Sequence, residues 1–299
     1  MNKPIYVCGS TASGKSALAI ALANKIDGEI VNGDAYQVYK GIETLSAAPS
    51  AEELSQAPHH LFSILSTNEE FDAQRYRELA QPVITEIQSR GKTPIIVGGS
   101  GMYLKFLTHG PSPVPASDPQ LRSELELRPD LDLIQQLTQL DPEGAAATNL
   151  QNRRYVIRAL EICLLSGKKM SSIKNDWKNT SVEVDKKLSG ALIQWEAEPL
   201  RQRIAIRTKM MLDSGAIEEI QNSKNLSVTC EKAIGVPQIQ AYLKGEMDKA
   251  TCEEKIFFAT CQYAKRQRTW FKKESWLTQL PYDSSTTASS ALDSLLKEL

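Results

Sequence analysis

The sequence lacks a run of apolar residues long enough to cross a membrane, because its longest apolar stretches are far shorter than about 20 residues. Its first residues, MNKPIYVCGS, are typical of an opening buried strand and not of a signal peptide. Five cysteines are present, but no two have the C-x-x-C spacing of zinc modules and redox motifs. We therefore expect a cytoplasmic protein with no membrane partner, no disulfide framework and no zinc module.

The sequence also lacks an excess of charge of either sign. Lysine and arginine total 35 residues against 36 aspartates and glutamates, which gives a formal net charge of −1. The chain as a whole therefore does not attract a polyanion, and a nucleic-acid partner would need a local basic surface. Internal repeats and low-complexity blocks are absent as well, so the 299 residues predict a globular protein of about two domains.

Four short apolar runs predict buried parallel strands, at residues 5–7, 29–32, 94–97 and 188–194. Three of them lead into a glycine or an acidic residue and then into a helical pattern. This alternation predicts an α/β fold, in which helices flank a parallel sheet. The longer helical patterns cover residues 72–90, 153–166, 199–223 and 251–274.

The character of the chain changes after the proline-rich segment PSPVPASDP. Two or three helical patterns follow it, and no strand pattern returns until about residue 187. We interpret residues 116–184 as an all-helical insertion. Residues 1–115 and 185–299 then form the two parts of one sheet domain.

The segment GSTASGKS fits the phosphate-binding pattern G-x-x-x-x-G-K-[ST]. It follows a predicted strand and begins a predicted helix, which is the context this P-loop motif requires. Its backbone N–H groups and Lys15 are expected to bind adjacent phosphates, and the Ser16 hydroxyl to bind Mg²⁺. The predicted anion-binding residues are Gly9, Ser10, Thr11, Ala12, Ser13, Gly14, Lys15 and Ser16. The motif predicts the anion but not the reaction, because a nucleotide and a diphosphate ester present the same groups.

The second predicted strand ends in NGDAYQVYKG, which places Asp34 beside the P-loop at the carboxyl edge of the sheet. A carboxylate there could act as a general base or assist Mg²⁺. The alternative is that Asp34 only caps the following turn.

A third strand–glycine–helix unit, VGGSGMYLKFL, places Ser100 where its hydroxyl could contact a phosphate or a base. The alternative is a purely structural turn. Its glycines do not have G-x-G-x-x-G spacing, so a dinucleotide site is not supported.

Three predicted helices carry basic residues at helical spacing. Arg154 and Arg158 form one pair, and Arg203 and Arg207 form another. The third face comprises Cys261, Lys265, Arg268 and Lys272. We identify no acidic residues that compensate these charges, so a polyanion site competes with the alternative of solvated helix faces.

Together these motifs resemble the tRNA dimethylallyltransferase family, also called tRNA isopentenyltransferases, of the bacterial type. The resemblance is specific because DAYQVYKG, VGGSGMYLK, RRYVIRALEICLLSGK and QYAKRQRTWF occur in one chain with the P-loop. It implies a P-loop NTPase-like sheet with an inserted all-helical subdomain. It also implies transfer of a dimethylallyl group from dimethylallyl diphosphate to N6 of the adenosine adjacent to the anticodon of tRNA. The implied enzyme is a monomer that uses Mg²⁺.

The resemblance assigns roles to individual residues. Asp34 corresponds to the catalytic aspartate, Ser100 to a catalytic threonine, and Lys15 and Arg207 to the cations at the diphosphate. The positions implied for tRNA binding are Asp34, Ala35, Tyr36, Gln37, Ser100, Arg122, Gln151, Asn152, Arg153, Arg154, Tyr155, Arg158, Lys265 and Arg268.

This chain departs from the family pattern mainly at positions that the family directs toward RNA. Ala35 replaces a serine, Cys261 replaces an arginine, and the segments 149–152 and 235–238 read NLQN and GVPQ instead of the usual motifs. We expect a donor site like that of the family and weaker or more selective tRNA binding. The alternatives are an adenylate dimethylallyltransferase, a small-molecule kinase with ATP in the P-loop, and a catalytically silent RNA-binding relative.

Overall fold

The computed structural model describes residues 2–111 and 113–298. The chain forms two compact units, one of residues 1–110 with 187–299 and the other of residues 111–186. The predicted insertion, residues 116–184, falls inside the second unit. Each unit has its own hydrophobic core and is described separately.

The first unit contains a six-stranded parallel sheet in the order β4-β2-β6-β1-β7-β8. Its strands are β1 (Ile5–Gly9), β2 (Gly28–Asn32), β4 (His59–His60), β6 (Thr93–Gly98), β7 (Ser189–Trp195) and β8 (Leu277–Tyr282). Two further short strands, β3 (Tyr39–Lys40) and β5 (Leu65–Ser66), pair with each other. The α/β fold and the four predicted strands are confirmed, whereas the edge strands β4 and β8 were not predicted.

Helices cover both faces of this sheet, and others lie beyond its end. The described helices of the first unit are α1 (Lys15–Ile26), α2 (Glu43–Ser46), α3 (Ala51–Gln56), α4 (Ala73–Ser89), α5 (Gly101–His109), α11 (Ala197–Asp213), α12 (Ala216–Asn222), η1 (Cys230–Lys232, a 3₁₀ helix), α13 (Val236–Leu243), α14 (Lys249–Phe271) and α15 (Ala288–Leu296). The prediction of one helix over residues 199–223 is wrong. The chain turns at Gly215, whose φ of 109° belongs to the left-handed region that glycine favours, and this turn separates α11 from α12.

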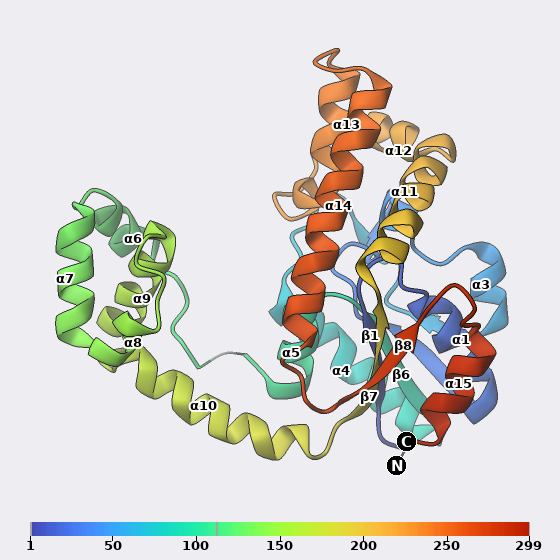
Figure 1. Ribbon diagram of the computed structural model, residues 1–299, viewed down its shortest axis with the longest axis horizontal. Coiled ribbons are helices and arrows are strands. Elements are labelled where there is room, and N and C mark those ends of the chain that lie inside the picture. Colours follow the sequence, from blue (N-terminus) through green and yellow to red (C-terminus); the bar gives the residue numbers. More distant parts are fainter. Residues whose placement is uncertain (1, 112, 299) are drawn as a thin grey trace. The chain divides into compact units, whose positions relative to one another are not determined.

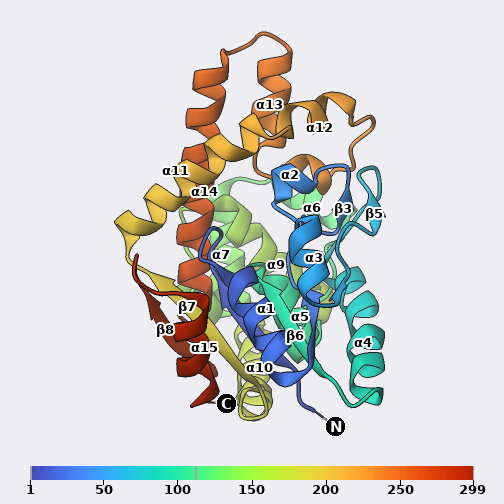
Figure 2. The ribbon, with the colours of Figure 1, turned by 90° about the vertical axis from the view of Figure 1, so that its right-hand side faces the viewer.

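Successive residues of the sheet point to opposite faces. Val7 packs in the core that includes residues of α1 and α15, whereas Tyr6 and Cys8 pack in the core that includes residues of α4 and α5. Helices α11 to α14 extend beyond one end of the strands (Figures 1 and 2). Since β7 leads directly into α11, this end is the carboxyl edge of the sheet, where ligands bind in open α/β folds.

The described part of the second unit is helical, with five helices where two or three were predicted. They are α6 (Pro119–Glu126), α7 (Asp130–Leu140), α8 (Pro142–Ala146), α9 (Arg153–Ser166) and α10 (Met170–Asp185). Leu133 and Leu137 of α7 are buried against Leu160 of α9 in a core of its own. The predicted range of α9 agrees with the structure.

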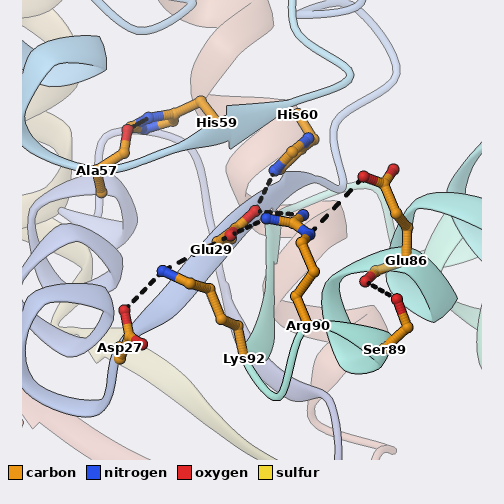
Figure 3. Close-up of polar contacts among 9 residues, drawn as sticks. All are labelled: Asp27, Glu29, Ala57, His59, His60, Glu86, Ser89, Arg90 and Lys92. Atoms are coloured by element: carbon orange, nitrogen blue, oxygen red, sulfur yellow. Dashed lines mark hydrogen bonds and ion pairs between the residues drawn. The ribbon is translucent and has the colours of Figure 1, made fainter.

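A cluster of charged residues fixes the sheet to the end of α4 (Figure 3). Glu29 of β2 is only 2% exposed, and its carboxylate accepts hydrogen bonds from Arg90 Nη1 at 2.6 Å and Arg90 Nη2 at 3.0 Å. His60 of β4 contacts the same carboxylate through Nε2 at 2.7 Å. The neighbouring His59 donates from Nδ1 to the carbonyl of Ala57 at 2.7 Å. Both histidines therefore have structural partners.

We expect Glu29→Gln to lower the free energy of unfolding by about 2 kcal/mol at pH 7, because a charged group held by several hydrogen bonds is lost. Burial alone would raise the pKa of Glu29, but the hydrogen bonds from Arg90 and His60 outweigh it and lower that pKa. The Glu29 carboxylate therefore contributes fully to the free energy of unfolding at pH values above the ordinary glutamate pKa. This contribution is lost as the pH falls through the lowered pKa that Glu29 has in the folded protein. Urea unfolding at several pH values should show the difference disappear in acid. In the control, exposed Glu86→Gln should change stability by less than about 0.5 kcal/mol.

Candidate active site

The P-loop joins β1 to α1 at the carboxyl edge of the sheet. Gly14 precedes the helix with φ of 94°, and Ala12 adopts φ of 61°, so the backbone turns tightly before Lys15 begins α1. Lys15 Nζ donates to the Ser10 carbonyl at 2.7 Å. Burial lowers the pKa of the Lys15 ammonium to about 8, and the charge of Asp34 opposes this lowering. A bound anion would meet a cation already placed at the loop.

Two side chains from later in the sequence hold the P-loop backbone. Arg203 of α11 donates from Nε to the Ala12 carbonyl at 2.8 Å. Its guanidinium carbon lies over the Trp195 ring, 4.7 Å from the ring centroid. Trp195 in turn donates from Nε1 to the Ser13 carbonyl at 3.0 Å. Arg203 was predicted only as part of a basic run, and its observed contacts instead support the loop.

Asp34 follows β2 in a turn that its own side chain stabilises. Asp34 Oδ1 accepts a hydrogen bond from the backbone N–H of Tyr36 at 2.9 Å. Asp34 therefore does cap the following turn, and this contact leaves its second carboxylate oxygen for another role. The next backbone N–H, of Ala35, donates to Ser100 Oγ at 3.0 Å. Ser100 is buried, and it fixes the Asp34 turn to the start of α5.

These elements surround a cavity of about 560 Å³ in the first unit. The predicted residues that line it are Thr11, Ala12, Ser13, Gly14, Lys15, Ser16, Asp34, Tyr36, Gln37 and Arg207. Burial lowers the pKa of Arg207 and the Asp34 charge acts against this, so the two groups interact electrostatically. The apolar residues of the lining include Leu45, Ile206, Met210, Met211, Ile234 and Ile256. The cavity thus combines the predicted anion-binding loop, two basic side chains, a carboxylate and apolar surface.

Tyr263 of α14 also lines the cavity and was not predicted as a site residue. Burial, and then the charge of Asp34, raises the pKa of its hydroxyl. Gln267 lies one helical turn later and was missed as well. Both residues belong to the segment QYAKRQRTWF, and their four-residue spacing on a predicted helix is the signal that could have identified them.

The predicted RNA-binding residues outside the Asp34 and Ser100 turns fall into two groups. Lys265 and Arg268 are exposed on α14 of the first unit. The others from the basic and polar segments, Arg122, Gln151, Asn152, Arg153, Arg154, Tyr155 and Arg158, belong to the second unit.

The prediction that acidic residues do not compensate the three basic runs is wrong for Arg158, and two predicted RNA-binding arginines outside those runs also have acidic partners. Arg158 pairs with the buried Glu161 at 2.7 Å and donates to the Pro115 carbonyl at 2.6 Å. Arg153 pairs with Asp130, and Arg122 contacts the exposed Glu126 at 3.4 Å. Arg154 and Tyr155, by contrast, are exposed. Arg153 and Arg158 therefore support the second unit whatever else they bind.

Comparison with known proteins decides the family. The family model described as IPP transferase matches residues 37–274. This chain belongs to the IPP transferase family. A tRNA dimethylallyltransferase of Akkermansia muciniphila is 40% identical over 295 residues, which cover 99% of each protein. One of Citrifermentans bemidjiense, named tRNA dimethylallyltransferase 1, is 38% identical over 287 residues, or 95% of this chain and 93% of that protein.

Solved structures of IPP transferases have the same fold. The tRNA Δ(2)-isopentenylpyrophosphate transferase of Staphylococcus epidermidis matches with a TM-score of 0.71 and 30% identity, over 100% of this chain and 98% of that one. A eukaryotic dimethylallyltransferase, studied acting on tRNA, matches with a TM-score of 0.76 and 29% identity, over 100% of this chain and 77% of that one. The central parallel sheet with flanking helices is therefore the fold that this IPP transferase shares with them.

Among the described residues of this IPP transferase, no helix is both long and apolar enough to cross a bilayer. No three histidine, cysteine, aspartate or glutamate side chains within residues 2–111 and 113–298 converge as a metal site.

Proposed function

We propose that this IPP transferase moves a dimethylallyl group from dimethylallyl diphosphate to N6 of the adenosine adjacent to the anticodon in tRNA. The observation that carries the proposal is the composition of one cavity. Lys15, Arg207 and the P-loop provide a diphosphate site, Asp34 provides a carboxylate, and apolar side chains complete the lining. A prenyl diphosphate needs an anion site with apolar surface beside it for the prenyl chain. The phosphate groups of a kinase substrate need only the anion site.

The donor site supports departure of the diphosphate. Backbone N–H groups of the P-loop and the start of α1 stabilise its negative charge, and Lys15 and Arg207 add two cations. Leu45, Ile206 and Met210 provide apolar contact for the prenyl carbons. The C1–O bond breaks, and the diphosphate leaves with the electron pair.

The acceptor reaction needs a base, because the lone pair of the adenine N6 amine is delocalised into the ring. We assign this role to Asp34, whose turn is fixed by Tyr36 N–H and by the contact between Ala35 and Ser100. As N6 forms its bond to C1, the Asp34 carboxylate takes the N6 proton. An adenine that is stacked between its neighbours in the anticodon loop cannot reach the cavity, so the adenosine must first leave the stack.

The residues present fit Mg²⁺. Ser16 and Asp34 both line the cavity, and their hydroxyl and carboxylate oxygens are the hard ligands that Mg²⁺ takes together with phosphate oxygens and water. We propose that the Ser16 hydroxyl would hold the ion. When bound, Mg²⁺ would neutralise negative charge on the leaving diphosphate.

The tRNA partner is assigned from exposed basic and aromatic groups. Lys265 and Arg268 on α14, and Arg154 and Tyr155 on α9, are free to contact phosphates and bases. We also propose that the protein is a monomer and that it acts in the cytoplasm, as the resemblance to bacterial tRNA dimethylallyltransferases implies.

The proposed function is tested by incubating the protein with Mg²⁺ and labelled dimethylallyl diphosphate, offering tRNA, AMP or no acceptor. Label in tRNA supports the proposal, and mapping should place it on the adenosine beside the anticodon. Label in AMP would instead identify an adenylate dimethylallyltransferase. Absence of transfer to either acceptor, combined with phosphoryl transfer from ATP, would identify a kinase.

Two arginines one helical turn apart should respond differently to substitution. Arg154→Gln should weaken tRNA binding a few-fold and reduce the salt slope of binding by about one, because one phosphate contact is lost. Arg158→Gln should instead lower the free energy of unfolding by about 2 kcal/mol, because the buried Glu161 loses its charged partner. Filter binding at several salt concentrations and urea unfolding distinguish the two effects. Equal loss of tRNA affinity in both variants, without a stability difference, would contradict the assignment.

A further inference from the structure

One buried amide connects the two glycine-containing turns of the site. Gln267 of α14 is 4% exposed. Its Oε1 accepts the backbone N–H of Thr11 in the P-loop at 2.8 Å, and its Nε2 donates to the carbonyl of Gly99 at 2.9 Å. Since Thr11 N–H is used in this way, it does not point at the diphosphate as the sequence predicted. An asparagine would be too short, and a carboxylate could not donate to Gly99.

The space at Gly99 is shaped by this contact. A Cβ atom at position 99 would lie 2.2 Å from Gln267 Nε2 and 2.9 Å from the carbonyl oxygen of Gly9. No side chain fits there while Gln267 is in place. Glycine at position 99 is therefore required by the close approach of Gln267 and of the Gly9 carbonyl.

The hydrogen bonds continue from Gln267 toward Asp34. Gly99 is followed directly by Ser100, whose Oγ accepts the N–H of Ala35, and Ala35 follows Asp34. The side chain of Gln267 thus links the P-loop to the Gly99 turn, and the side chain of Ser100 links that turn to the Asp34 turn. The helix that carries Gln267 also presents Lys265 and Arg268 to solvent.

We infer that Gln267 is a positioning residue, which holds the diphosphate-binding loop and the Asp34 turn in the register that prenyl transfer needs. The inference rests on the proposed function, because it names Asp34 as the base. Gln267 is not among the residues that line the cavity, so it is not assigned a contact with either substrate. It acts through Thr11 on one side and through Gly99 and Ser100 on the other.

The variant Gln267→Met tests this role, because it keeps the length of the side chain and removes both hydrogen bonds. We expect the dissociation constant for inorganic diphosphate to rise about tenfold, as one hydrogen bond that orders the loop is lost. The kcat for transfer to tRNA should fall further, about 100-fold, because small displacements of reacting groups have large effects on rate. In the control, exposed Gln262→Met on the same helix should change neither quantity by more than about twofold.

Double substitution separates positioning from a general loss of structure. Ser100→Ala breaks the same connection at the next link, so its effect on kcat should be much smaller in the Gln267→Met background than in the wild type. Additive effects of the two substitutions, or a kcat of Gln267→Met within twofold of the wild type, would overturn the inference. If Gln267→Met does not fold, Gln267→Glu keeps the acceptor for Thr11 and should still lower kcat about 100-fold.

The binding measurement also distinguishes this inference from the proposed function. If the wild-type protein transfers no prenyl group to tRNA, the proposed function fails. A tenfold loss of diphosphate affinity in Gln267→Met would then still support the positioning of the P-loop. An unchanged diphosphate affinity would overturn that role as well.

Discussion

Asp34→Asn should lower kcat for prenyl transfer to tRNA by about 10³-fold, while inorganic diphosphate still binds. Asparagine has the size of aspartate and can keep the hydrogen bond from Tyr36 N–H through its carbonyl oxygen. It cannot accept the proton that leaves N6. The measurement is single-turnover transfer of labelled dimethylallyl to saturating tRNA, combined with calorimetric titration of diphosphate.

A second aspartate provides the matched control for this prediction. Asp72 Oδ1 accepts the backbone N–H of Arg75 at the start of α4, where asparagine caps equally well. Asp72→Asn should therefore transfer at the wild-type rate within about twofold. Normal turnover in Asp34→Asn would remove Asp34 as the base. A parallel loss of diphosphate affinity would show that Asp34 acts on the donor instead.

Lys15→Met should lower kcat/KM for dimethylallyl diphosphate by about 10² to 10³-fold, because a cation at the departing diphosphate is lost. The lysine also predicts how donor binding depends on pH. Its pKa is lowered to about 8, so the ammonium is present below pH 8 and is lost as the pH rises above it. Donor affinity should therefore fall by up to about tenfold for each pH unit above 8.

Two variants check the assignment to Lys15. Lys15→Arg keeps its charge at every accessible pH, so any affinity that it retains should not decline between pH 8 and pH 10. Lys25→Met removes an exposed lysine from the last turn of the same helix and should leave donor kinetics unchanged. The pH dependence is measured by titrating the donor at constant ionic strength. A wild-type affinity that stays constant up to pH 10 would contradict the lowered pKa.

The sequence predicts the interior of the sheet well because buried parallel strands are continuous apolar runs, as in β1 and β6. It does not predict β8, which lies at the sheet edge and pairs only with β7. Half of that strand is exposed or partly exposed, and it contains Pro281, which has no N–H to donate to the sheet. Edge strands carry little of the apolar pattern on which such a prediction depends.

Site residues that belong to a local motif can be predicted from the sequence, whereas the contacts of those that reach the site from distant parts of the chain cannot. The P-loop and Asp34 are recognisable because each follows a strand directly, and the carboxyl edge of the sheet then brings them together. Glu161 lies only three residues after Arg158, so their ion pair was open to prediction. Arg203 and Gln267 contact the P-loop from 191 and 256 residues away in the chain. Helical spacing could mark Gln267 as a site residue, but no local pattern shows which loop either side chain contacts.

The place of β1 in the sheet has a consequence for how the protein is made. On a ribosome, β1 and β6 emerge early, but β7, which completes the other side of β1, follows only after the whole second unit. At about 5 to 20 residues per second, that interval lasts several seconds. The second unit is continuous in sequence and has its own core, so it can fold during the wait. The parallel sheet, with the P-loop at its edge, is therefore the part whose folding finishes last. A chain cut short before β7 would leave the edge of β1 open to pairing with other chains.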